Sequence, residues 1–113
     1  MIEKEARNGM SAKAEAARFR ERLIKDFLDL VILNEAMEAE VSGYSIITLI
    51  HKRFRFLISS GNVYGMLYFL ERKGLLQGVW KERKRVYRTT EQGLKMLTAI
   101  LDLKDLDLRK LLF

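Results

Sequence analysis

Five cationic side chains crowd into a short stretch of this chain, and the chemistry that they can do is the binding of anions. They are Lys81, Arg83, Lys84, Arg85 and Arg88, with a single acid, Glu82, among them. Like charges at this spacing repel one another unless anions lie nearby, and guanidinium and ammonium groups pair well with phosphate oxygens. Such contacts supply affinity more than a choice of sequence. The alternative is a solvated loop tip without a partner.

A second group of polar side chains lies upstream, at the start of an amphipathic segment. It contains Ser59, Ser60, Asn62 and Tyr64. The first turn of a helix attracts phosphate through its backbone N–H groups and its dipole, and the hydroxyl groups would add donors there. The amide of Asn62 can pair bidentately with adenine. Plain capping is the favoured role for Ser59, and Tyr64 also suits simple packing.

The segment that carries this second group is predicted to be a helix. Val63, Leu67 and Leu70 fall on one face at helical spacing, so this face belongs to the core. Gly74 suits the left-handed position that follows a helix C-terminus. The polar first turn then lies at the exposed beginning of the helix.

A β-hairpin is predicted to present the cationic run. Its strands are Leu75–Trp80 and Val86–Thr89, and Lys81–Arg85 forms the loop. The loop contains no Asn-Gly or Gly-Gly pair, so we expect a longer, flexible tip and not a tight turn. Trp80 is expected to pack on the hairpin or under the core. As a stacking platform for single-stranded bases it would need more aromatic neighbours than the strands offer.

Further helices complete the predicted architecture. Residues 1–11 are expected to be flexible, and a long first helix runs from Ala12 into the acidic stretch Asn34–Glu40. Ser42 is expected to cap the next helix, which ends near Phe54. The order helix, helix, hairpin is typical of a winged helix-turn-helix.

The last predicted helix covers residues 91–113 and is unusually rich in leucine. One small domain cannot bury so many leucines, so we expect this helix and the first one to join two copies of the chain. The side chains expected at this contact are Phe19, Leu23, Phe27, Leu97, Leu101, Leu108 and Leu111. The fold class is therefore mainly α with a two-stranded wing (α+β): a winged helix-turn-helix domain at residues 12–90 and a dimerisation helix at 91–113.

The charge of the chain is concentrated in its middle. Ile46–Thr90 holds ten Lys and Arg against two acids, a net charge of +8, and the remaining residues carry eleven against thirteen. A cationic centre between near-neutral ends is typical of a phosphate-binding surface. A basic protein that only needs solubility would scatter its charges along the chain.

Composition argues against several classes of function. Cysteine is absent and histidine occurs once, at His51, so we predict no catalytic residues, no metal site and no cofactor. The chain has no uncharged apolar run of about 18 residues, so no membrane contact is expected. The charged start Met1–Glu5 is unlike a secretory signal, which predicts an intracellular protein of the cytoplasm, associated with the nucleoid.

The residues from Ser59 onward resemble a known motif. The string Ser59-x-Gly61-x-x-Tyr64-x-x-Leu67-x-x-Leu70-Glu71-x-x-Gly74-Leu75-Leu76 resembles the signature of the PadR-type winged-helix transcriptional regulators. Gly43-Tyr44 upstream and Arg85-x-Tyr87-Arg88-x-Thr90-Glu91-x-Gly93 downstream are similar to other parts of the family pattern. The resemblance covers most of the chain, from about Phe27 to Leu97.

The resemblance implies a homodimer that binds a palindromic operator in double-stranded DNA and usually represses. In some relatives a small aromatic or cationic ligand enters near the dimer interface and weakens DNA binding. The chain departs from the family pattern at Ser60 and Gly65, where proline is common, and at Tyr68 and Phe69, where basic residues are frequent. Two alternatives stay open: an architectural, chromatin-type protein that binds DNA without sequence choice, and a protein–protein adaptor that docks through Met66 and Phe69.

Overall fold

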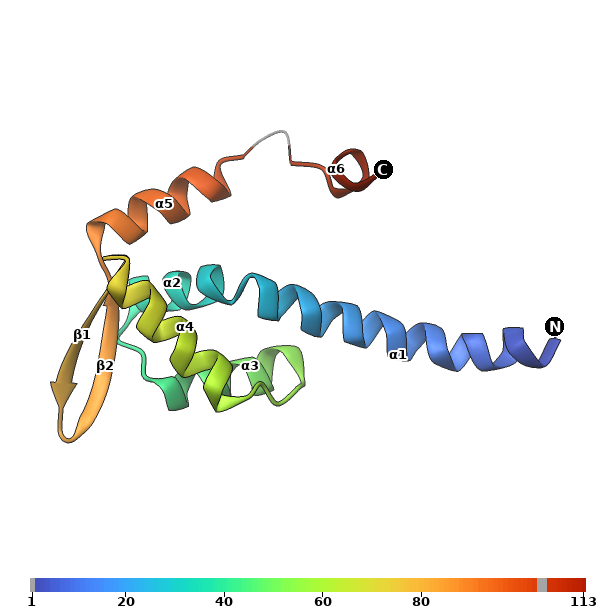
Figure 1. The fold of residues 1–113 in the computed structure, drawn as a ribbon, viewed down its shortest axis with the longest axis horizontal. Coiled ribbons are helices and arrows are strands. Elements are labelled where there is room, and N and C mark those ends of the chain that lie inside the picture. The colour runs from blue at the N-terminus through green and yellow to red at the C-terminus, as the bar shows by residue number, and fades with distance from the viewer. Residues whose placement is uncertain (1, 104–105) are drawn as a thin grey trace.

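The structure is a computed structural model that describes residues 2–103 and 106–113 of the chain (Figure 1). In chain order its elements are α1 (Ile2–Asp26), α2 (Leu28–Glu38), α3 (Gly43–Phe54), α4 (Ser60–Arg72), β1 (Leu76–Lys81), β2 (Lys84–Thr89), α5 (Glu91–Leu101) and α6 (Leu108–Leu112). Helices α2, α3 and α4 pack together with α5 and the hairpin. This is the predicted winged helix-turn-helix.

The hydrophobic core lies between α2, α3, α4 and the base of the hairpin. The largest fully buried side chains come from all of these elements and from α5: Leu28, Ile32, Leu33, Ile46, Ile50, Val63, Leu67, Leu70, Leu76 and Leu97. The core face predicted for α4 is therefore confirmed. Burial of these side chains is what fixes the orientation of α4 against the rest of the domain.

Local signals position the two helices of the helix-turn-helix. The Ser42 hydroxyl accepts the N–H of Ser45 at 3.1 Å and caps α3. The Ser59 hydroxyl accepts the N–H of Asn62 at 3.1 Å and caps α4. Gly74 follows α4 with a φ of +78°, a conformation that glycine adopts without a steric penalty. All three positions are as the sequence predicts.

The first helix differs from the prediction at both ends. It begins at Ile2, so residues 2–11, expected to be flexible, are helical. It also ends at Asp26, because Phe27 has φ −110° and ψ 26°. The Leu30 N–H donates to the Asp29 carboxylate at 2.8 Å, a local hydrogen bond that competes with the helical ladder. The chain then continues as α2 in much the same direction (Figure 1).

The hairpin loop is tighter than predicted. The strands pair antiparallel with Trp80 opposite Arg85 and Lys81 opposite Lys84, so that only Glu82 and Arg83 lie between them. Both of these residues have positive φ, 50° and 67°. Positive φ at both central residues is typical of a type I′ turn, whose twist matches that of the strands. The expectation of a long, flexible tip was wrong, because the strand twist selects this turn even without an Asn-Gly pair.

The C-terminal region is two helices in place of the one predicted. Helix α5 ends at Leu101, and α6 starts afresh because the Asp107 carboxylate accepts the N–H of Arg109 at 2.9 Å. Leu97 also differs from the prediction. It is only 2 % exposed, in the core of its own domain, and is not available for a contact between copies.

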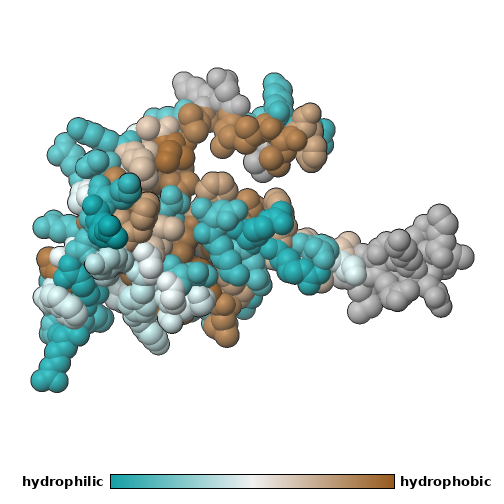
Figure 2. All heavy atoms as spheres, in the orientation of Figure 1, coloured by the Kyte–Doolittle hydropathy of each residue, from teal (hydrophilic) through white to brown (hydrophobic). Residues whose placement is uncertain are grey.

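The other side chains predicted at such a contact have varied surroundings. Phe19, Phe27, Leu101 and Leu111 are exposed and Leu23 is half-buried, whereas the side chain of Leu108 lies outside the described part. Hydrophobic residues gather over α5 and α6 in Figure 2. In the described residues, no helix combines the length and the hydropathy needed to span a membrane.

Candidate nucleic-acid interface

The outward face of α4 is a stripe of four residues, which we call the α4 stripe: Gly61, Gly65, Tyr68 and Arg72. Their spacing places them on one side of the helix, away from the buried side chains. A side chain at Gly61 or Gly65 would meet nothing within 4 Å, so both glycines face open space. The first two turns of α4 therefore expose their backbone, and another molecule can approach it closely.

The polar residues at the start of α4 divide into two roles. The Ser59 hydroxyl is used by the cap, as the sequence favours, whereas Ser60 and Asn62 are exposed. The Tyr64 ring leans on α3, where a side chain at Gly43 would overlap it. Ser60 and Asn62 are thus free to reach a partner, and Tyr64 joins α4 to α3 while about half of its surface stays exposed.

Two cations of the hairpin are engaged by acids. The Lys81 ammonium lies 2.8 Å from a carboxylate oxygen of Glu40, and the Arg85 guanidinium pairs with Glu71 of α4. The hydrogen bond to Glu71 raises the pKa of Arg85 above its ordinary value. Lys81 and Arg85, which the sequence predicts as DNA contacts, tie the hairpin to the helical part of the domain through these ion pairs.

The remaining cations of the hairpin point to its tip and outer side. Arg83, Lys84 and Arg88 are exposed and make no ion pair with any residue that the structure describes. Arg83 occupies the turn itself, and Lys84 opens β2 beside it. Within the hairpin, these three residues are free to neutralise phosphates of a ligand.

A crevice of about 450 Å³ connects the hairpin with the helix-turn-helix. Its walls are Tyr44 of α3, Tyr64 of α4, and Trp80, Arg83, Lys84 and Arg85 of the hairpin. Tyr64 in the second turn of α4 and the wing tip therefore border one concave surface.

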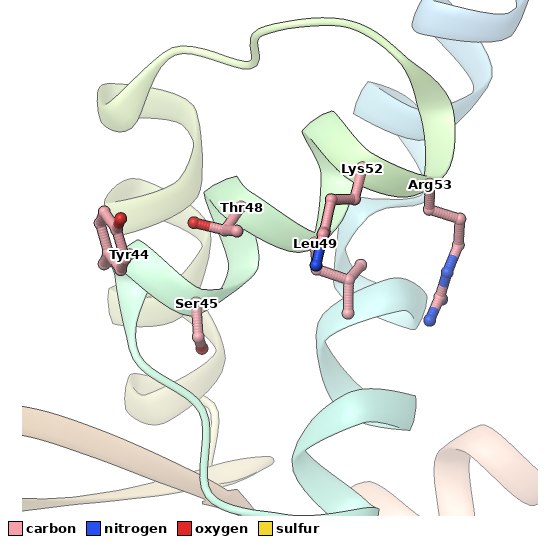
Figure 3. A pocket seen from close by; sticks show the side chains of 6 residues that line it. All are labelled: Tyr44, Ser45, Thr48, Leu49, Lys52 and Arg53. Atoms are coloured by element: carbon pink, nitrogen blue, oxygen red, sulfur yellow. The ribbon is translucent and has the colours of Figure 1, made fainter.

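A second hollow, of about 620 Å³, follows the exposed side of α3 (Figure 3). Tyr44 and Thr48 project from the same side of the helix, with Ser45 and Leu49 beside them. Lys52 lies at the far end, and the neighbouring Arg53 is held by Glu35 of α2 at 3.0 Å. The first helix of a helix-turn-helix crosses the DNA backbone, so Tyr44, Thr48 and Lys52 are further candidates for phosphate contacts.

Comparison with known proteins identifies the family of this chain. Residues 32–99 match the model of the transcriptional regulator PadR-like family. The chain belongs to this family. A search of curated sequences gave no match. Among solved structures, the chain is similar to a PadR-like transcriptional regulator from Bacillus cereus, with 28% identity, a TM-score of 0.63, and coverage of 71% of this chain and 82% of the other.

Two more structures have the same fold. A transcriptional regulator from Clostridium thermocellum is 25% identical, with a TM-score of 0.65 over 71% of this chain and 82% of its own. The PadR of Bacillus subtilis, crystallised with operator DNA, is 20% identical, with a TM-score of 0.62 over 72% of this chain and 49% of its own. The winged helix described above is thus the fold that these solved structures share with the chain.

Several residues of this surface were not predicted from the sequence. Tyr68 follows Gly65 by three residues and Arg72 follows Tyr68 by four, a period that the helix prediction already contained. Tyr44 and Trp80 could not be grouped from the sequence, because they meet only through the tertiary fold. Within the described residues, no cluster of three or more metal-ligating side chains occurs.

Proposed function

We propose that this protein binds double-stranded DNA as a homodimer, at a specific operator, and represses transcription there. The observation that carries the proposal is the single concave surface bordered by α4 and by the exposed cations Arg83 and Lys84. On such a surface α4 can enter the major groove while the wing contacts the phosphates beside it. The operator complex of the Bacillus subtilis PadR supports the proposal through the shared fold. The protein would act in the cytoplasm, at the nucleoid.

Binding without sequence choice is the second candidate, and one feature of α4 favours it. Gly61 and Gly65 leave half of the α4 stripe without side chains, so that Asn62, Tyr68 and Arg72 are the groups left to reach base edges. A backbone that lies close to the groove responds to the shape of DNA more than to its sequence. An architectural protein would use the surface in this way.

Selection of bound sequences from a random duplex pool separates the two candidates. A dimeric regulator enriches a palindrome whose half-sites lie about 10 base pairs apart, one turn of the double helix. An architectural protein binds the pool without enriching any motif. A chain that binds no duplex even at low salt contradicts both candidates.

The wing contacts can be tested by removing two charges. We expect Arg83→Ala with Lys84→Ala to weaken binding to every duplex and to reduce the slope of log affinity against log salt by about two, because each phosphate contact releases about 0.9 counterion. The control Lys13→Ala with Lys95→Ala removes the same charge from α1 and α5. Fluorescence anisotropy titrations measure both slopes. Equal slopes of log affinity against log salt for the two variants would show that the wing does not contact DNA.

A further inference from the structure

Three exposed aromatic rings meet at the crevice between the wing and the helix-turn-helix. Tyr44 is 73 % exposed, Trp80 69 % and Tyr64 51 %, although each comes from a different element. The strands alone offered Trp80 too few aromatic neighbours for a stacking site, but α3 and α4 supply them. Arg85 lies 5.6 Å from the Trp80 ring and restrains it on one side. The remainder of the ring is open to a ligand.

The charge of the same crevice is positive. Arg83, Lys84 and Arg85 line it, and no acid does so among the described residues. Glu71 balances Arg85, which leaves the charges of Arg83 and Lys84 for a ligand. A phosphate monoester carries a charge of about −1.5 to −2 at neutral pH, which matches these two cations.

From these observations we propose that the crevice binds a single nucleotide unit, with its planar base against Tyr44 and Trp80 and its phosphate against Arg83 and Lys84. The volume of 450 Å³ falls within the range of about 300 to 1,000 Å³ found for ligand sites. Aromatic rings accept any base by stacking, and two cations fix the phosphate. A base inside a duplex is stacked on both faces, so the occupant is a free nucleotide or an unpaired nucleotide of a strand.

The single tryptophan of the chain gives a direct readout of this site. In the ¹⁵N-labelled full-length protein, we expect adenosine monophosphate to shift the Trp80 indole N–H signal in a saturable way. Ribose 5-phosphate lacks the base and adenosine lacks the phosphate, so each should bind roughly tenfold more weakly or worse. Ribose 5-phosphate that binds as tightly as the nucleotide would overturn the stacking role, and adenosine that does so would overturn the phosphate role.

A matched pair of variants tests the rings without removing the readout. Tyr44→Leu changes a largely exposed side chain and should lower the affinity for adenosine monophosphate roughly tenfold. Phe69→Leu is the control, because Phe69 lies beside Arg72 and Lys73 in another hollow and does not line the crevice. Equal losses for the two variants, or no loss for Tyr44→Leu, would overturn the proposal.

A short single-stranded oligodeoxyadenylate distinguishes the two sources of the nucleotide. Tighter binding of the strand than of adenosine monophosphate assigns the site to unpaired nucleotides of a nucleic acid, and equal or weaker binding assigns it to free nucleotides. If neither compound shifts the Trp80 signal, the proposal is wrong. Duplex binding is measured separately by anisotropy, so a protein that binds duplex but neither compound contradicts this inference alone.

Discussion

The guanidinium of Arg85 is held on several sides by its own domain. It pairs with Glu71 and lies 5.6 Å and 5.8 Å from the ring centroids of Trp80 and Tyr87. A side chain at Gly78 would lie within 3 Å of both partners of the ion pair, so glycine leaves the room that the pair needs. Arg85 therefore orients the wing against α4. Charge and spacing along a strand could not reveal this, because Glu71 lies on another element.

Tyr87 makes the same region sensitive to alkaline pH. Burial raises the pKa of its phenol above the ordinary value of 10.0, and the nearby Glu71 carboxylate adds to this effect. Above about pH 10 the unfolded chain loses the phenolic proton before the folded chain does. The free energy of unfolding is therefore expected to fall as the pH rises from 10 through the pKa of the folded state.

The substitution Tyr87→Phe should flatten this alkaline fall. Urea unfolding at about pH 8 and about pH 11 measures it, as the difference between the two free energies of unfolding. Tyr68→Phe is the control, since Tyr68 is exposed. An equally steep fall in Tyr87→Phe would assign the alkaline sensitivity to other groups.

At the scale of elements, the sequence best predicts the features that depend on residues close together in the chain, such as helix caps. Ser42, Ser59 and Gly74 act within four residues of their own positions, and all three were found as predicted. The break at Phe27 and the turn at Glu82–Arg83 were missed. The turn depends on the twist of two paired strands, which composition does not encode. The break lies at Phe27, which leaves the helical region of φ and ψ although the helical pattern of apolar residues continues across it.

The strained turn leads to a prediction about stability. Glu82 and Arg83 both hold positive φ, which disfavours residues other than glycine and asparagine. Replacement by Asn-Gly (Glu82→Asn with Arg83→Gly) should raise the free energy of unfolding by about 1 kcal/mol, because this pair suits a type I′ turn. Urea denaturation measures the change. The same variant should bind DNA more weakly, since it lacks the Arg83 guanidinium.

Arg83→Ala is the matched control for this prediction. It removes the same guanidinium as the Asn-Gly variant but keeps the Glu82 carboxylate and leaves residues with a Cβ atom at both positive φ positions, so no gain in stability is expected. If Arg83→Ala were as stable as the Asn-Gly variant, the gain would come from lost charge repulsion between the wing cations and not from the backbone.

The whole molecule is extended for its length. Its radius of gyration is 17.3 Å and its extents are 58 × 36 × 20 Å, whereas a compact domain of about 100 residues has a radius near 13 Å. The excess comes from α1, which projects from the domain, and from α6, which lies beyond the far end of α5 (Figure 1). Apolar side chains of these helices are exposed within one copy, and contact with a second copy can bury them.

The substitution Leu101→Glu tests this proposed contact between copies. Leu101 is 66 % exposed, so the change should leave the single domain folded, but a carboxylate in a dry apolar contact would cost several kcal/mol. Sedimentation should therefore show a dimer for the unaltered chain and a monomer for Leu101→Glu. Leu57→Glu is the control, because Leu57 is 76 % exposed and lies between α3 and α4, outside the helices expected to form the contact.

The consequence for DNA binding follows from symmetry. A dimer occupies both half-sites of a palindrome at once, and the second contact forms at a high effective concentration. The Leu101→Glu monomer keeps α4 and the wing, so it should bind a single half-site as well as the unaltered chain does. Its affinity for the full palindrome should fall to the level of that half-site. Should sedimentation show an intact dimer and anisotropy an unchanged affinity for the palindrome, the contact between copies must lie away from Leu101.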